Sequence, residues 1–274
     1  MTSSSKLPVF LFLMVLAAGC ERVIDLDVGE NASLPVMSFR LNADSGQILG
    51  TITRSVDYFS PEEPEVVLDA EVHLISEAGD TTFVPSQALS GFYVSQEVGD
   101  VFADGSTAAL EVRVDGVTYR AENAAAAAVL PLDSLEVREA PEFPFGDPLD
   151  SASTQYEVYL HFPAAAQSHN LLVEYFVNGE PETGTIQVLK TSPNTPTIIP
   201  LGWNQRFFDP GEAVLVWAWT LPEDSYDYWL ALSNIAGSAG PGGVPGNPPN
   251  HWDQEALGHF TVGRLEVAEV FMPQ

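Results

Sequence analysis

Cys20 is the residue whose surroundings point most directly to chemistry. It follows Leu16 and the small residues Ala17, Ala18 and Gly19, and small side chains leave the backbone open to a peptidase. Leucine is the more usual residue where this chain has Ala17. Because Cys20 is the only cysteine of the chain, it has no partner for an internal disulfide. We therefore expect cleavage before Cys20 and attachment of diacylglycerol to its thiol.

The residues before Cys20 have the pattern of a signal peptide. A polar start ending in Lys6 is followed by an uninterrupted apolar run up to Gly19. Spanning a bilayer takes about 20 apolar residues, and the run is shorter than that and ends at Glu21 and Arg22. We predict a signal peptide over residues 1–19.

The mature chain is then expected to begin with a lipidated tether over residues 20–33. Two or three acyl chains give stable anchoring without a protein helix. Glu21 follows the cysteine directly, in place of the aspartate associated with inner-membrane retention. We expect anchoring in the outer membrane, and the choice between its periplasmic and cell-surface faces stays open.

The other residue types offer no recognisable catalytic pattern. The sequence contains no Gly-x-Ser-x-Gly elbow, no His-Glu-x-x-His and no glycine-rich phosphate loop. The histidines are scattered, and His73 and His161 fall on the polar faces of expected strands, so we expect surface histidines. We predict no catalytic residues, no metal site, no cofactor and no enzymatic activity. The histidines are His73, His161, His169, His251 and His259.

All five tryptophans lie in the second half of the chain. Trp217, Trp219 and Trp229 follow strand and helix patterns and are expected in the core. The remaining two adjoin segments rich in glycine and proline, the longer of which spans residues 237–250, and long loops are often functional. The candidate contacts for a partner or ligand are Trp203, Asn247, Pro248 and Trp252.

Acidic residues dominate the charge of the chain. The sequence has 38 Asp and Glu against 10 Lys and Arg, for a formal net charge of -28. Such a field repels phosphate backbones, which excludes nucleic acid as a partner. A salty habitat would explain the excess, because high salt screens self-repulsion, and a bias of composition in the lineage would explain it equally.

The first half of the mature chain shows the period-two alternation of half-buried strands. Met37, Phe39 and Leu41 share one face. The clearest hairpin spans residues 110–121, where Asp115-Gly116 forms the turn. This register pairs Val114 with Val117, Val112 with Tyr119 and Leu110 with Ala121, and it puts all six side chains on one face. We expect a β-sandwich domain over residues 34–130.

The second half is predicted as another β-rich domain, over residues 131–274. The alanine run 124–128 is helical by propensity but is at least as well read as a connector before Pro131. Apolar residues on both faces of 213–219 indicate a central strand. One helix is expected after Thr220, which forms a capping box with Glu223. Strands over 257–262 and 264–272 end the chain.

Several short motifs recur in the order typical of one family. Their order and spacing resemble an uncharacterised family of Gram-negative envelope lipoproteins, called domain of unknown function 4249. The motifs are Cys20 to Asp27, Asp57-Tyr58-Phe59, Ala70-Glu71-Val72, Gly91-Phe92-Tyr93, Val114 to Tyr119, Pro131 to Leu135, Gly246-Asn247-Pro248 and Leu257 to Phe260.

The resemblance implies an all-β chain, with an immunoglobulin-like or transthyretin-like β-sandwich first and a second β-rich domain carrying one helix. Members of this family are often encoded beside TonB-dependent transporters of the outer membrane. We therefore expect a non-enzymatic accessory lipoprotein that is anchored through Cys20 and binds such a transporter or its cargo. The alternative is a surface protein that binds or degrades glycans.

Overall fold

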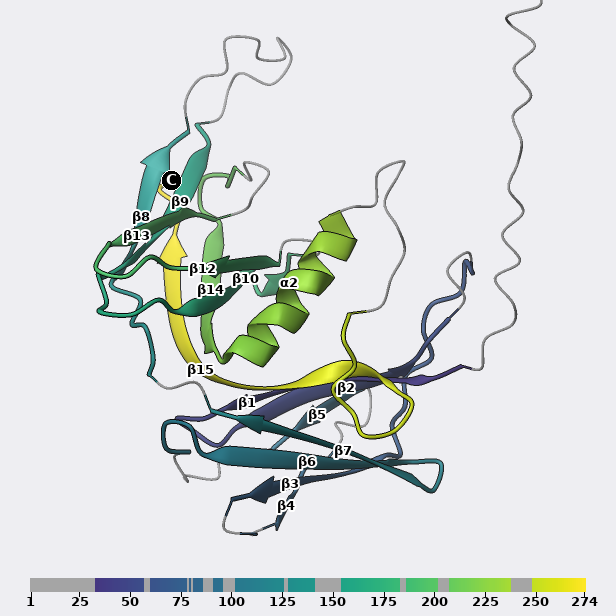
Figure 1. The fold of residues 1–274 in the computed structure, drawn as a ribbon. Helices are drawn as coiled ribbons and strands as arrows, with labels where there is room; N and C mark the ends of the chain where they lie inside the picture. Colours follow the sequence, from purple (N-terminus) through teal and green to yellow (C-terminus); the bar gives the residue numbers. More distant parts are fainter. Residues whose placement is uncertain are drawn as a thin grey trace, which may run out of the picture. The chain divides into compact units, whose positions relative to one another are not determined.

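The computed structural model describes residues 33–56, 60–77, 79, 81–85, 91–95, 102–125, 128–140, 154–182, 186–201, 207–237 and 248–274. Within these ranges the chain is all-β and sandwich-like, with several sheets and one helix, α2 (Glu223–Gly237), as predicted (Figure 1). The finer likeness to immunoglobulin or transthyretin domains stays a prediction.

The strands up to the alanine run are β1 (Pro35–Asn42), β2 (Ile48–Arg54), β3 (Glu71–Ser76), β4 (Thr81–Phe83), β5 (Phe92–Val94), β6 (Thr107–Val114) and β7 (Val117–Ala124). Those after it are β8 (Ser134–Glu139), β9 (Tyr156–Phe162), β10 (Asn170–Val177), β11 (Glu180–Pro181), β12 (Gln187–Lys190), β13 (Thr197–Pro200), β14 (Ala213–Leu221) and β15 (Leu257–Phe271).

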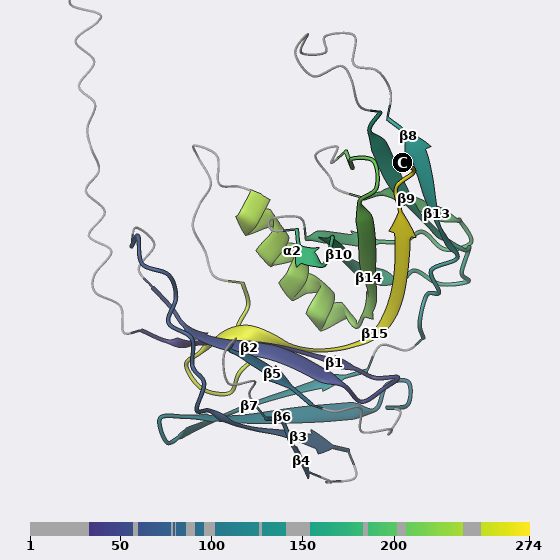
Figure 2. The same cartoon turned by 180° about the vertical axis from the view of Figure 1, so that it is seen from behind.

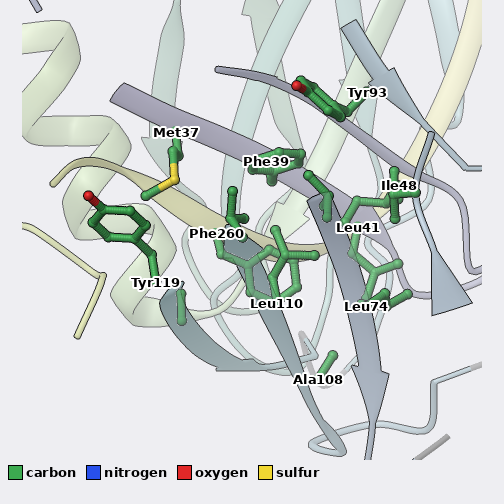
Figure 3. Packing of buried hydrophobic residues seen from close by; sticks show 14 of the residues in the cluster. Met37, Phe39, Leu41, Ile48, Leu74, Tyr93, Ala108, Leu110, Tyr119 and Phe260 are labelled. Atoms are coloured by element: carbon green, nitrogen blue, oxygen red, sulfur yellow. The ribbon is translucent and has the colours of Figure 1, made fainter. Parts of the chain in front are cut away.

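Two sheets enclose the first hydrophobic core. One has the strand order β4-β3-β6-β7, and the other contains β5, β2, β1 and the start of β15. Met37 and Phe39 of β1 point into this core together with Leu110 of β6 and Phe260 of β15 (Figure 3). Burying one such side chain contributes about 1.5–3 kcal/mol, so the alternation in β1 explains why these strands form a sandwich.

The hairpin of β6 and β7 has the predicted register. Val114 pairs with Val117, Val112 with Tyr119 and Leu110 with Ala121. The turn residues Asp115 and Gly116 have φ of 51° and 79°, the left-handed conformations that a two-residue turn of this type requires. Of the six apolar side chains only Val117 is exposed.

β14 is a central strand, as predicted, with one face in the second core and the other covered by α2 only around Trp219 and Leu221. It lies between β10 and β15. Val214 and Val216 contact the second core, which the small sheet β13-β9-β8 closes. On the opposite face, Trp219 and Leu221 belong to a cluster of buried side chains with Tyr228 and Trp229 of α2. Figure 2 shows α2 beside β10 of the same sheet.

The prediction of two terminal strands was wrong, because β15 is one continuous strand. Its first part pairs in parallel with β1, from Leu257 to Gly263, and its second part pairs antiparallel with β14, from Arg264 to Phe271. Gly263 suggested a break between two strands, yet it lies within the continuous strand, where a Cβ would be only 3.1 Å from the carbonyl oxygen of Thr220. The strand therefore passes from one half of the chain to the other without interruption.

The predicted capping box was also wrong. Thr220 belongs to β14, and its hydroxyl accepts the amide of Leu130 at 3.0 Å. The helix begins at Glu223, and the carbonyl of Pro222 accepts its first amide, that of Tyr226. The carboxylate of Glu223 instead binds the ammonium of a lysine on β12, at 2.9 Å.

The described part of the alanine run is not helical: Ala124 ends β7, and Ala125 and Ala128 lie outside any helix. Apart from Trp252, Ala256, Phe260 and Val262, the residues of the first core end at Ala125, and the second core begins at Leu130. β15 nevertheless contributes to both halves. The division into domains at residue 131 therefore stays a prediction.

Candidate functional site

The predicted contact residues have different outcomes. Cys20, Trp203 and Asn247 lie outside the described residues. Pro248 is half-buried, and its role as a contact stays a prediction. Trp252 was expected to be exposed, and this was wrong.

Trp252 is only 5% exposed and belongs to the first core. Its indole N–H donates to the carbonyl of Met37 at 3.3 Å, and its ring meets that of Phe39 edge to face. The side chain of Asn250 accepts a hydrogen bond from the backbone amide of Trp252 and donates one to the carbonyl of Trp252, both at 3.1 Å. This local turn folds the segment back onto β1. The glycine- and proline-rich sequence next to Trp252 did not predict this burial.

The histidines divide into two groups. His73 and His161 are half-exposed on strand faces, as expected, and His161 bonds a carboxylate oxygen of Glu136 at 2.8 Å. For His169 and His259 the surface expectation was wrong, since both are buried. Burial lowers the pKa of His169. The described residues contain no group of three or more His, Cys, Asp or Glu placed to hold a metal ion.

His259 lies at the centre of a buried polar network that the sequence patterns missed. Its Nε2 is 3.0 Å from the hydroxyl oxygen of Ser225 on α2. The amide group of Asn123 on β7 donates to that oxygen at 2.9 Å and to the carbonyl of Phe260 at 3.0 Å. The network therefore joins β7, α2 and β15.

The environment keeps His259 neutral. Its imidazole stacks between the rings of Tyr228 and His251, at centroid distances of 4.6 and 4.2 Å. Burial lowers the pKa of His259 to about 3, and the neighbouring His251 acts in the same direction. Burial also lowers the pKa of His251 and raises that of Tyr228. The neutral ring can accept the hydroxyl proton of Ser225.

A serine at hydrogen-bond distance from a neutral histidine is the geometry of an activated nucleophile. Ser225 is 0% exposed, however, and His259 is 3% exposed. Tyr228 and Trp229 cover them from α2, and the indole of Trp229 donates to Thr261 at 3.0 Å. In this conformation a substrate atom has no path to the hydroxyl, so the arrangement acts as a structural link between elements.

An accessible feature lies on the sheet of β10, β14 and β15. α2 covers the row formed by Leu172, Trp219 and Leu265. Arg40 lies at the end of the covered row. Its guanidinium carbon is 5.5 Å from the ring centroid of Trp219, and the guanidinium forms an ion pair with Glu174. Beyond this row the same face of the sheet is not covered by the helix.

We call the uncovered side chains the open face. Val267 is 54% exposed and Phe271 is 65% exposed, and both are on β15. Trp217 of β14 lies directly opposite Val267, and its ring is 4.8 Å from that of Phe176 on β10. The open face consists of Phe176, Leu215, Trp217, Val267 and Phe271, with Glu174 and Glu269 at the intervening positions of the same face.

The second part of β15 also has a free backbone edge. In an antiparallel pair, alternate residues direct both amide and carbonyl to the partner strand. The amide of Met272 donates to the carbonyl of Glu212 beside β14, so even-numbered residues face β14. None of the strands in the described ranges pairs with the opposite edge over residues 265–271. The outward-facing residues of this outer edge are Leu265, Val267, Glu269 and Phe271.

A shallow cavity of about 320 Å³ lies where the tether meets the folded chain. Ser33 is fastened there by a bond from its hydroxyl to the carbonyl of Ser55. Arg54 and Asp115 form an ion pair on the cavity wall. The cavity lining is Ser33, Leu34, Pro35, Arg54, Val114, Asp115, Val117, Tyr119, Gln254 and Glu255.

Comparisons with known proteins leave the family open. No protein-family model matches the chain, and no curated protein is similar to it. The resemblance to domain of unknown function 4249 therefore stays a prediction. In the part of the chain that the structure describes, no helix is long and apolar enough to cross a membrane.

Proposed function

We propose that this chain is a non-enzymatic lipoprotein of the outer membrane that binds a partner through its second half. The observation that carries the proposal is the open face, where Val267 and Phe271 expose more than half of their surface next to Trp217. Contiguous apolar surface of this kind marks interaction sites in soluble proteins. The proposed partner is a TonB-dependent transporter or its cargo.

Anchoring through Cys20 would hold the start of the folded part, at Ser33, near the membrane surface. The 13 residues from 20 to 32 precede Ser33, and a fully extended chain spans about 3.3–3.6 Å per residue. Ser33 would therefore stay within about 45 Å of the lipid. This range suits a partner that is itself embedded in the outer membrane.

A Cys20→Ser variant tests the anchor. We expect the wild type to sediment with membranes and to incorporate labelled palmitate, because the thiol is the acyl acceptor. The variant is expected in the soluble periplasmic fraction without label. Membrane sedimentation of the variant, with no label in either protein, would contradict lipid anchoring.

Affinity capture tests the binding role. The tagged wild type, solubilised from membranes in mild detergent, is compared with a Val267→Asp/Phe271→Asp double variant, which places charge on the open face. We expect a TonB-dependent transporter with the wild type and at least tenfold less of it with the variant. Val117→Asp is the matched control, because Val117 is exposed on the other half of the chain.

The glycan alternative is an outcome of the same comparison. A glycan array probed with both proteins reports sugar binding directly. A clear glycan signal that the double variant loses, together with no captured transporter, would replace the proposed partner by a glycan.

A further inference from the structure

The outer edge of β15 extends the open face into the backbone. Residues 265–271 supply seven positions, close to the usual length of a strand. The outward amides and carbonyls of Val267 and Glu269 have no strand beside them within the described ranges. An unpaired edge of this length is a template for another strand.

We infer that this edge binds its partner by strand addition, and that the added segment is extended and basic. The inference rests on the proposed function and specifies how the partner is held. In an antiparallel addition, the segment exchanges both backbone hydrogen bonds with each outward-facing residue. Antiparallel pairing is also slightly more stable per residue than parallel pairing.

Side chains on the open face define the pattern of the added strand. Val267, Glu269 and Phe271 alternate along β15 as apolar, acidic and apolar. Directly opposite residues on one face interact most strongly when both are apolar or when their charges are opposite. The segment therefore presents an apolar residue, a Lys or Arg two positions on, and another apolar residue after two more.

Charge also decides between a second copy of this chain and a different partner. Pairing two outer edges would bring Glu266 and Glu269 of one copy beside those of the other, and each copy carries a formal net charge of -28. Each basic residue in the described ranges already lies within 4.0 Å of a carboxylate, so none of these residues in a second copy is an unpaired cation for Glu269. These residues are Arg40, Arg54, Arg113, Arg120, Arg138, Lys190 and Arg264.

A designed peptide tests the pairing. The probe is fluorescein-labelled Thr-Ile-Thr-Lys-Thr-Ile-Thr with blocked ends, whose isoleucines and lysine fall opposite Val267, Glu269 and Phe271. Binding to the full mature protein in detergent is followed by fluorescence anisotropy. One control peptide carries N-methyl groups on the Ile and Lys amides, which face β15 in this register. A second carries them on threonine amides, which face away.

We expect the unmodified peptide and the second control to bind alike, and the first control to bind at least tenfold more weakly. Glu269→Lys should reverse the charge preference, favouring a peptide with Glu in place of Lys. Glu269→Pro removes an outward amide without touching the β14 ladder, and it should weaken binding at least tenfold while circular dichroism stays unchanged.

Equal binding by both methylated peptides would overturn strand addition, because side chains alone would then hold the segment. The proposed function would survive that result if transporter capture still depended on Val267 and Phe271. If no peptide binds at concentrations up to about 1 mM, the inference is also overturned. Amide hydrogen exchange gives an independent readout: peptide binding should slow exchange at Val267 and Phe271 more than at Ala268.

Discussion

At the scale of single residues, buried polar side chains define how the two halves of the chain are joined. Arg264 lies where β15 passes from β1 to β14, and its guanidinium binds Asp44, Asp104 and the carbonyl of Phe102. His259 lies five residues earlier on the same strand and bonds Ser225 on α2. Both side chains are more than nine-tenths buried, so each depends on its neighbours for hydrogen bonds in place of water.

The neutral state of His259 makes stability depend on pH. Its pKa is about 3 in the folded chain and about 6.5 in the unfolded chain, so the unfolded chain binds the extra proton between these values. Stability is therefore complete above pH 6.5 and falls as the pH drops toward 3. The limiting slope from one such group is roughly 1 kcal/mol per pH unit.

We expect this slope to disappear in His259→Gln. Urea unfolding of both proteins between pH 7 and pH 4.5 measures the difference in unfolding free energy. The variant should be less stable at pH 7, because it loses the stack with Tyr228, and the gap should narrow by roughly 1 kcal/mol per pH unit below 6.5. Carboxyl groups elsewhere titrate in both proteins and cancel. A gap that stays constant would show that the pKa of His259 is the same in the folded and the unfolded chain.

At the scale of elements, the parallel pairing of β15 with β1 depends on Gly258. This residue has a φ of +101°, and a Cβ there would overlap the backbone carbonyl of Met37. Backbone cannot move aside as the end of a flexible side chain can. The same Met37 carbonyl accepts the indole of Trp252, so displacement would disturb the first core as well.

Gly258→Ala is therefore expected to destabilise the fold by about 3 kcal/mol or more, combining backbone strain with overlap. Gly116→Ala is the matched control, since Gly116 also has a positive φ but no atom within 4 Å of the added Cβ. It should cost only about 1 kcal/mol. Chemical denaturation midpoints compare the two variants, and equal losses would show that the Met37 overlap is relieved at no cost.

The elements also show which features were predictable from sequence. The register of the 110–121 hairpin and the central position of β14 were predicted, because both follow from the pattern of side chains within a short segment. The continuity of β15, the helix start after Pro222 and the burial of His259 were not. Each of these depends on residues more than 30 positions away, such as Ser225 for His259. Patterns within a short segment do not predict such contacts.

The candidate site shows the same limit. Sequence patterns directed attention to Trp203 and Trp252 because both lie near glycine and proline. The open face instead combines side chains of β10, β14 and β15. These side chains are exposed because α2 covers only the neighbouring row of the sheet. The alternation of Val267, Glu269 and Phe271 was visible in the sequence, yet only the strand order shows that nothing pairs beside them in the described ranges.

At the scale of the whole molecule, the acidic excess sets the response to salt. The chain has 38 acidic and 10 basic residues, so ion pairs leave most carboxylates without a cation. Exposed ion pairs such as Arg113 with Glu71 contribute about 0–1 kcal/mol each. Repulsion among the remaining carboxylates is the larger electrostatic effect on the folded state.

We expect the melting temperature to rise by several degrees between about 20 mM and about 1 M NaCl, where the screening length falls to about 3 Å. Differential scanning fluorimetry measures the change. A reference protein with a net charge near zero, melted in the same buffers, reports the general effect of the salt. A melting temperature that rises no more than that of the reference would show that self-repulsion does not limit stability.

The path of β15 also determines the order in which the molecule can be assembled. This one strand supplies Phe260 and Val262 to the first core and the neighbour strand that β14 needs. Residues 257–272 are synthesised after all the strands they join. Neither half can therefore reach its final packing before these residues have emerged, and the arrival of β15 completes both halves together.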